Sequence, residues 1–157
     1  MSEMMFSGDD LGAVLPESLR GLVVIDSLPL PAPIFHTVAR ALQTAAEAVT
    51  LVAWVRRRVL VVFATAPFRL NLPNGELRYT PNPEVIHCHV EDIIFIDVNK
   101  LLPMQFQHQV ATILEELVHV LLSIADEELV SVVVAHLYDG VQWVDGKYVV
   151  AGEKAQS

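Results

Sequence analysis

The chain has 157 residues, the size of a single domain able to bury a hydrophobic core. Hydrophobic residues make up 53% and charged residues only 18%, against typical values of about 45–50% and about 25%, so we expect part of the apolar surface to be shared in a homo-oligomer, most simply a dimer. The net charge of −9, with eight acids and two lysines between residues 115 and 157, argues against a nucleic-acid partner, which requires a basic footprint.

Nothing in the sequence indicates export or a membrane partner. The first residues lack the positive and apolar segments of a signal peptide. No apolar run reaches the roughly 18 residues that a membrane span needs, and the lone Cys88 cannot form an internal disulfide. These features predict a cytoplasmic protein.

The first third of the chain predicts one strand and one helix after a loose, acidic lead over residues 1–18. Residues 21–26, "GLVVID", are apolar and β-branched, as in a strand. The prolines of "SLPLPAP" favour an extended segment, because they fix φ and keep the preceding residue out of the α region. Residues 34–49 carry apolar side chains at helical spacing and predict an amphipathic helix, with Trp54 as its furthest end.

The middle of the chain, from about residue 58 to residue 98, predicts a twisted and mainly antiparallel sheet. "RVLVVFAT" has the composition of a strand, and "FRLNL" and "ELRYT" flank a Pro-Asn-Gly turn, as in a hairpin. "EVIHCHV" (84–90) and "IIFIDV" (93–98) are two further strands on either side of a break at residues 91 and 92.

The last third predicts two helices and a hairpin. The pattern is helical from Pro103 to about Ile124, and a second helix runs from Asp126, its expected N-cap, to about Tyr138. "VQWV-DG-KYVV" predicts a hairpin with a type I′ turn. Residues 1–157 are therefore expected to form one α+β domain with an N-terminal helix, a mainly antiparallel sheet and two packed C-terminal helices.

The first of the late helices carries a narrow polar stripe on an otherwise apolar surface. With about 100° per residue, His119 lies about 40° from Glu115 and Glu116 about 100° from it, while apolar residues cover the remaining arc. Glu115 and His119 are one turn apart and could hold the same ion. A solvated face of an amphipathic helix has the same pattern, and this alternative stays open.

The string "TILEELVHVLL", residues 112–122, resembles the zincin metallopeptidase helix with its His-Glu-x-x-His motif. It is most similar to the minimal zincins, small intracellular peptidases of the phage-repressor-cleaving and radiation-response type. In that family a strand leads into the motif helix, and a following helix supplies an acidic third ligand. Here "IIFID" and "DEELVSVVVAHLY" stand in the same order, so the resemblance covers about residues 93–138.

The resemblance implies a role for each matching residue. His119 corresponds to the second histidine of the motif, a metal ligand, and Glu116 corresponds to the glutamate that acts as general base. Glu128 matches the third ligand best, with Asp126 and Glu127 as alternatives.

Glu115 departs from the motif, because it stands where the first histidine is expected. One imidazole and two carboxylates form a harder ligand set than two histidines and suit Mn²⁺ or Fe²⁺ comparatively better, so the expected cofactor is a divalent metal, Zn²⁺ or else Mn²⁺ or Fe²⁺. The resemblance thus implies a zincin-like fold and one of two functions. The protein is either a divergent metallopeptidase that hydrolyses a peptide or protein substrate with metal-activated water, or a descendant that kept the fold and lost the chemistry. The alternative is a non-catalytic oligomeric interaction or assembly domain with a solvated acidic helix face.

His87 and His89 form a second candidate group on the strand 84–90, where both side chains point to the same face. They could bind a metal together, lie on the solvated side of the sheet, or line the groove beside the helix site. Cys88, on the other face, is expected to be a core thiol.

Overall fold

The computed structural model describes residues 4–52, 57–73, 75–80, 86–90 and 92–152. Its helices are α1 (Gly8–Gly12), α2 (Ala32–Thr50), α3 (Val98–Leu101), α4 (Phe106–Leu122) and α5 (Glu127–Leu137). Its strands are β1 (Met5–Phe6), β2 (Val23–Ser27), β3 (Leu30–Pro31), β4 (Val59–Ala64), β5 (Phe68–Leu72), β6 (Gly75–Tyr79), β7 (His87–Val90), β8 (Ile93–Asp97), β9 (Val141–Val144) and β10 (Lys147–Val150). This mixture confirms the α+β class, with an N-terminal helix (α2) and two C-terminal helices (α4 and α5) that pack together.

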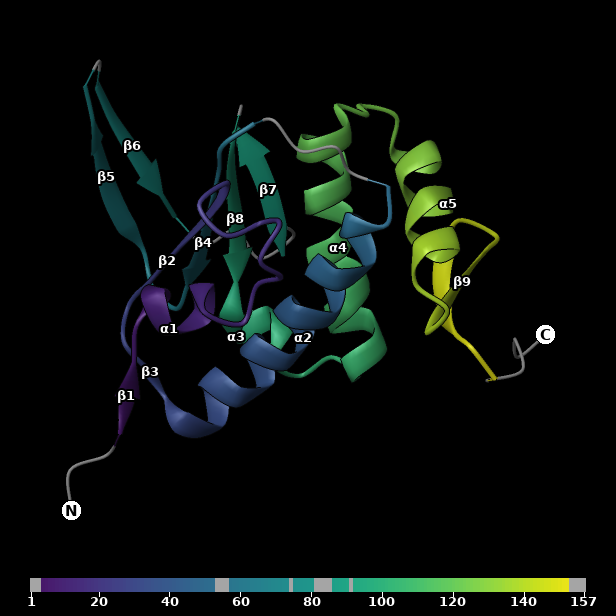
Figure 1. Ribbon diagram of the computed structural model, residues 1–157, viewed down its shortest axis with the longest axis horizontal. Helices are drawn as coiled ribbons and strands as arrows, with labels where there is room; N and C mark the ends of the chain where they lie inside the picture. Colours follow the sequence, from purple (N-terminus) through teal and green to yellow (C-terminus); the bar gives the residue numbers. More distant parts are fainter. Residues whose placement is uncertain (1–3, 53–56, 74, 81–85, 91, 153–157) are drawn as a thin grey trace.

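A four-stranded sheet in the order β2-β4-β8-β7 forms the centre of the fold (Figure 1). β2, β4 and β8 are parallel, and only β7 runs antiparallel to its neighbour β8. The expectation of a mainly antiparallel sheet is therefore wrong for this sheet. The reason is that α2 carries the chain back between β2 and β4, as parallel strands require. β4 and β8 are buried almost throughout, the property that distinguishes parallel strands from half-solvated antiparallel ones.

Residues 5–12 form β1 and α1, in contrast to the loose lead expected over residues 1–18. Ser7 caps α1 in a capping box with Asp10, whose Oδ2 accepts a 2.7 Å hydrogen bond from the Ser7 backbone N–H. Leu11 and Leu15 are fully buried in the core. Gly8 is required by close approach, because a Cβ there would lie 2.6 Å from the carbonyl oxygen of Ile25.

Most other elements match the sequence prediction. α2 corresponds to the helix expected over residues 34–49, and Trp54 lies outside the described residues. It begins earlier than expected, with Pro33 in its first turn, where a missing N–H does no harm. The extended segment is thus limited to the residues before Ala32, including β3. β7 lies within the strand expected over residues 84–90, of which 84 and 85 are outside the described residues.

Both predicted hairpins are present. β5 and β6 pair antiparallel and project from the body of the protein (Figure 1). β9 and β10 are joined through Asp145 and Gly146, both with positive φ (49° and 77°), as a type I′ turn requires.

α4 is the helix around which the functional candidates gather. It packs against α2 on one side and against α5, β7 and the β9–β10 hairpin on others, which explains why the helix is apolar over most of its surface. In the part of the chain that the structure describes, no helix combines the length and apolarity needed to cross a membrane.

Candidate metal site

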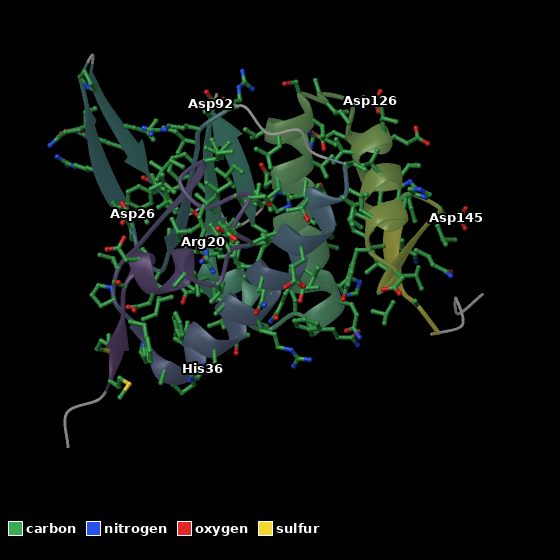
Figure 2. The ribbon with its side chains drawn as sticks, viewed as in Figure 1. Arg20, Asp26, His36, Asp92, Asp126 and Asp145 are labelled. Carbon is green, nitrogen blue, oxygen red and sulfur yellow. The ribbon has the colours of Figure 1, made fainter. Side chains whose placement is uncertain are left out.

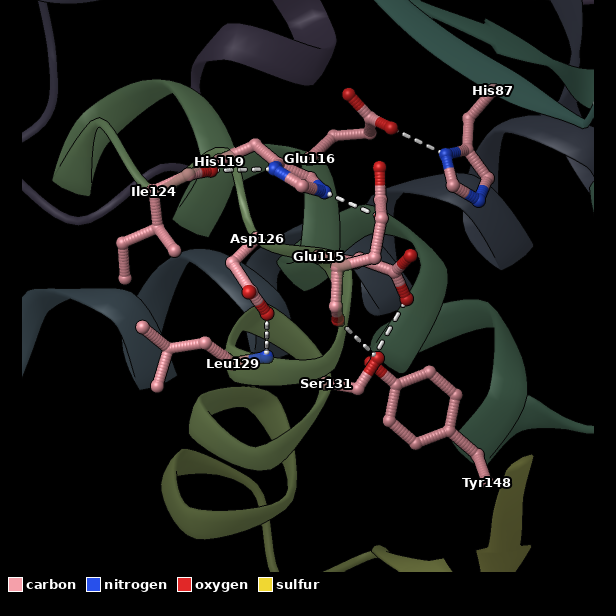
Figure 3. Close-up of polar contacts among 10 residues, drawn as sticks. His87, Glu115, Glu116, His119, Ile124, Asp126, Leu129, Ser131 and Tyr148 are labelled. Atoms are coloured by element: carbon pink, nitrogen blue, oxygen red, sulfur yellow. Dashed lines mark hydrogen bonds and ion pairs between the residues drawn. The ribbon is translucent and has the colours of Figure 1, made fainter. Parts of the chain in front are cut away.

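Three side chains from α4 and α5 converge at the C-terminal half of α4. Glu115 and His119 lie one turn apart on α4, and Glu127 is the first residue of α5. One ligand atom of each lies within 4.8 Å of the others. Figure 3 shows Glu115 and His119 on α4. Glu115, His119 and Glu127 are referred to below as the triad.

The chain reversal between the two helices brings Glu127 to this position. Ser123 ends α4 in the left-handed conformation, with φ of 54°. Asp126, at the end of α5 nearest to this loop (Figure 2), accepts a 2.8 Å hydrogen bond from the backbone N–H of Leu129 and so caps α5, as the sequence predicts. The Asp126 carboxylate is used in this cap, and the next residue, Glu127, places Oε2 3.1 Å from Nε2 of His119 on α4.

His119 has one ring nitrogen fixed and the other directed at the triad. Nδ1 lies 2.7 Å from the carbonyl oxygen of Ile124, and because a carbonyl only accepts, Nδ1 must carry the hydrogen. Nε2 therefore faces Oε2 of Glu127, at 3.1 Å. The imidazole is 5% exposed. Nε2 and the carboxylate are both acceptors when His119 is neutral, so a proton or a metal cation has to lie between them.

Glu115 is held by a residue from the far end of the sequence. The hydroxyl of Tyr148, on β10, donates a 2.8 Å hydrogen bond to Oε2 of Glu115. Burial raises the pKa of Tyr148, and the charges of Glu115 and Glu127 raise it further, so the hydroxyl stays a donor at neutral pH. The half-buried Glu115 is thereby fixed in rotation.

Glu116 is buried on the neighbouring face of α4 and pairs with Nδ1 of His87 on β7. Burial alone lowers the pKa of His87. The hydrogen bond to Glu116, together with the charges of Glu116, Glu115 and Glu127, outweighs burial and leaves the pKa of His87 raised. An imidazolium–carboxylate pair thus lies next to the triad.

The structure places the sequence-predicted residues as follows. Glu115 and His119 come together, and Glu116 lies beside them and outside the triad. The third acid is Glu127, one of the two alternatives, whereas the exposed Glu128 is not part of the group because it points about 100° further round α5.

Of the two histidines expected on one face of the strand 84–90, the structure describes the side chain of His87 alone. His87 lines the space beside the helix site, one of the possibilities left open by the sequence, while the side chains of Cys88 and His89 lie outside the described residues. Tyr148 joins the site without any signal in the sequence. No spacing rule connects a hairpin tyrosine to a glutamate 33 residues earlier.

Comparison with known proteins finds no family model that matches the chain, and no matching curated protein or solved structure. The donor set of the triad is one imidazole nitrogen and two carboxylates. Such a set suits Zn²⁺, Mn²⁺ or Fe²⁺. The side chain of Glu127 is 78% exposed, so an ion bound here would be open to solvent on that side.

Proposed function

We propose that the triad binds a divalent metal ion and that the protein is a zincin-like metal-binding protein of the cytoplasm, a divergent metallopeptidase. The observation that carries the proposal is the orientation of His119. A metal-ligating histidine almost always donates its other ring N–H to a carbonyl or carboxylate, and Nδ1 of His119 has such a partner in Ile124. The other ring nitrogen, Nε2, faces Oε2 of Glu127 at 3.1 Å, with an oxygen of Glu115 within 4.8 Å of the ligand atoms of both residues.

The surrounding contacts support the same function. Tyr148 orients Glu115, and the hydroxyl of Ser131 donates a 2.9 Å hydrogen bond to the backbone carbonyl of Glu127, which steadies the first turn of α5. Metal ligands with such fixed partners are pre-organised and lose less conformational entropy when the ion binds.

In this proposal Glu116 acts as the general base. When bound, the metal would supply Lewis-acid chemistry and a water of lowered pKa. Glu116 would take up the proton, and its hydrogen bond to His87 orients the carboxylate for that role. Peptide or protein substrates are proposed on the zincin resemblance alone.

The alternative function, a non-catalytic interaction domain, treats the triad as a solvated acidic face in which a protonated His119 bridges two carboxylates. The two functions predict different metal affinities. If the protein is an interaction domain, neutralising Glu127 and neutralising its neighbour Glu128 have equally little effect on metal binding.

The test is an isothermal titration calorimetry experiment in which Zn²⁺ or Mn²⁺ is added to untagged protein that has been freed of metal with a chelator. We expect one ion to bind per chain, with affinity reduced at least about tenfold in Glu127→Gln. Glu128→Gln removes the same charge one position further along α5 and is the matched control, with affinity unchanged. Absence of binding in the parent, or equal effects of the two substitutions, would contradict the proposal.

A further inference from the structure

The C-terminal hairpin β9–β10 reaches into the triad and connects two of its members. Tyr148 on β10 donates to Oε2 of Glu115 at 2.8 Å (Figure 3). Its ring packs edge-on against Trp143 of β9, with ring centroids 5.0 Å apart, and its backbone carbonyl lies 3.3 Å from Nε2 of His108 on α4. The hydroxyl is therefore held by ring packing and by a backbone contact to the helix that carries the ligands.

Ser131 extends this connection to α5. Its hydroxyl contacts that of Tyr148 and donates to the backbone carbonyl of Glu127. A chain of polar contacts thus runs from the Glu115 carboxylate through Tyr148 and Ser131 to the backbone carbonyl of Glu127. Tyr148 therefore holds one carboxylate directly and contacts, through Ser131, the helical turn that carries the other.

The contact to Glu115 has a consequence for coordination. A carboxylate binds a metal through one oxygen or through both. Tyr148 donates to Oε2, which occupies part of the acceptor capacity of that oxygen, restricts the rotation of the carboxylate and favours Oε1 as the donor to a metal. Glu115 then offers one donor atom, as the histidine of the zincin motif would.

We propose that Tyr148 is a positioning residue that holds Glu115 as a one-oxygen ligand and so selects a four-coordinate ion, Zn²⁺, over ions that require more oxygens, such as Mn²⁺. The inference rests on the proposed metal function and adds to it the selectivity of the site. Zn²⁺ favours four tetrahedral ligands, whereas Mn²⁺ favours six oxygen-rich ones, so the number of carboxylate oxygens decides between them.

The experiment compares the parent with Tyr148→Phe, which removes the hydroxyl and keeps the ring. Co²⁺ serves as the spectroscopic probe, because tetrahedral Co²⁺ absorbs visible light several-fold more strongly than five- or six-coordinate Co²⁺. We expect intense bands in the parent and a several-fold loss of intensity in Tyr148→Phe. We also expect the ratio of Zn²⁺ affinity to Mn²⁺ affinity to fall about tenfold. This is the size of effect seen when a residue that hydrogen-bonds a metal ligand is removed.

Tyr138→Phe is the matched control, because it removes a tyrosine hydroxyl at the opposite end of α5, and it should change neither quantity. If Tyr148→Phe does not fold, Ser131→Ala replaces it, with a smaller change in the same direction. A parent that binds Co²⁺ and Zn²⁺ while Tyr148→Phe leaves spectrum and preference unchanged would overturn this inference and leave the metal function intact. A parent that binds neither ion would overturn both.

Discussion

The buried pair between Glu116 and His87 gives a prediction that does not depend on metal. Glu116 has a side chain only 4% exposed, and that of its partner His87 is 22% exposed. Replacing His87 by alanine leaves a carboxylate in the interior without this partner. Breaking a buried ion pair from one side costs about 3–5 kcal/mol, and the partial exposure of His87 favours the lower end, so we expect a loss of about 3 kcal/mol.

The loss should depend on pH in a defined direction. Because the pKa of His87 is raised in the folded protein, its contribution to stability is fully present below the pKa of the unfolded chain, near 6.5. The contribution is lost as the pH rises through the higher pKa of the folded state. The difference between His87→Ala and the parent should therefore be larger at pH 6 than at pH 9.

Urea unfolding in the presence of a chelator measures both quantities and keeps metal from contributing. His136→Ala, an exposed histidine on α5, is the control and should cost less than about 0.5 kcal/mol. A loss below about 1 kcal/mol in His87→Ala, independent of pH, would refute the argument that these two side chains form a buried ion pair.

The remaining predictions concern the metal and self-association. Glu115→His restores His-Glu-x-x-His and should raise Zn²⁺ affinity about tenfold in calorimetry; an unchanged affinity would exclude Glu115 as a ligand. Glu116→Gln should bind the metal as the parent does and should lack the peptide hydrolysis that the parent shows in a fluorogenic-peptide assay. Hydrolysis retained in this variant would exclude Glu116 as the base. Light scattering at micromolar concentration should give the mass of a dimer, because Leu129 and Val132 on α5 are about half exposed; the mass of a monomer would contradict this.

The periodic patterns in the sequence predicted the helices and hairpins well, because those elements depend on local chemistry. The Asp126 cap and the Asp-Gly turn are examples, since each is determined by a few adjacent residues. The direction of the central strands was not predicted correctly, because it depends on α2 as a crossover. The segment around α1 was missed because its buried anchors, Leu11 and Leu15, lie in a short stretch of mixed polarity that has no clear helical or strand periodicity.

The candidate site shows the same division between local and distant information. Glu115 and His119 could be paired from the sequence, because helical spacing alone puts them on one face. The choice between Glu127 and Glu128 depends on how the loop after Ser123 orients α5, which no pattern gives. Tyr148 joins the site only through the packing of the hairpin against α4.

Metal content of the parent and of His119→Ala, purified without chelator and without a nickel column, tests the central claim most directly. His119 supplies the nitrogen that Ile124 orients towards both carboxylates, so its loss should remove the ion even if the fold persists. We expect elemental analysis to find close to one divalent ion per parent chain and almost none in His119→Ala. A parent free of metal, or equal metal in the two proteins, would contradict the account.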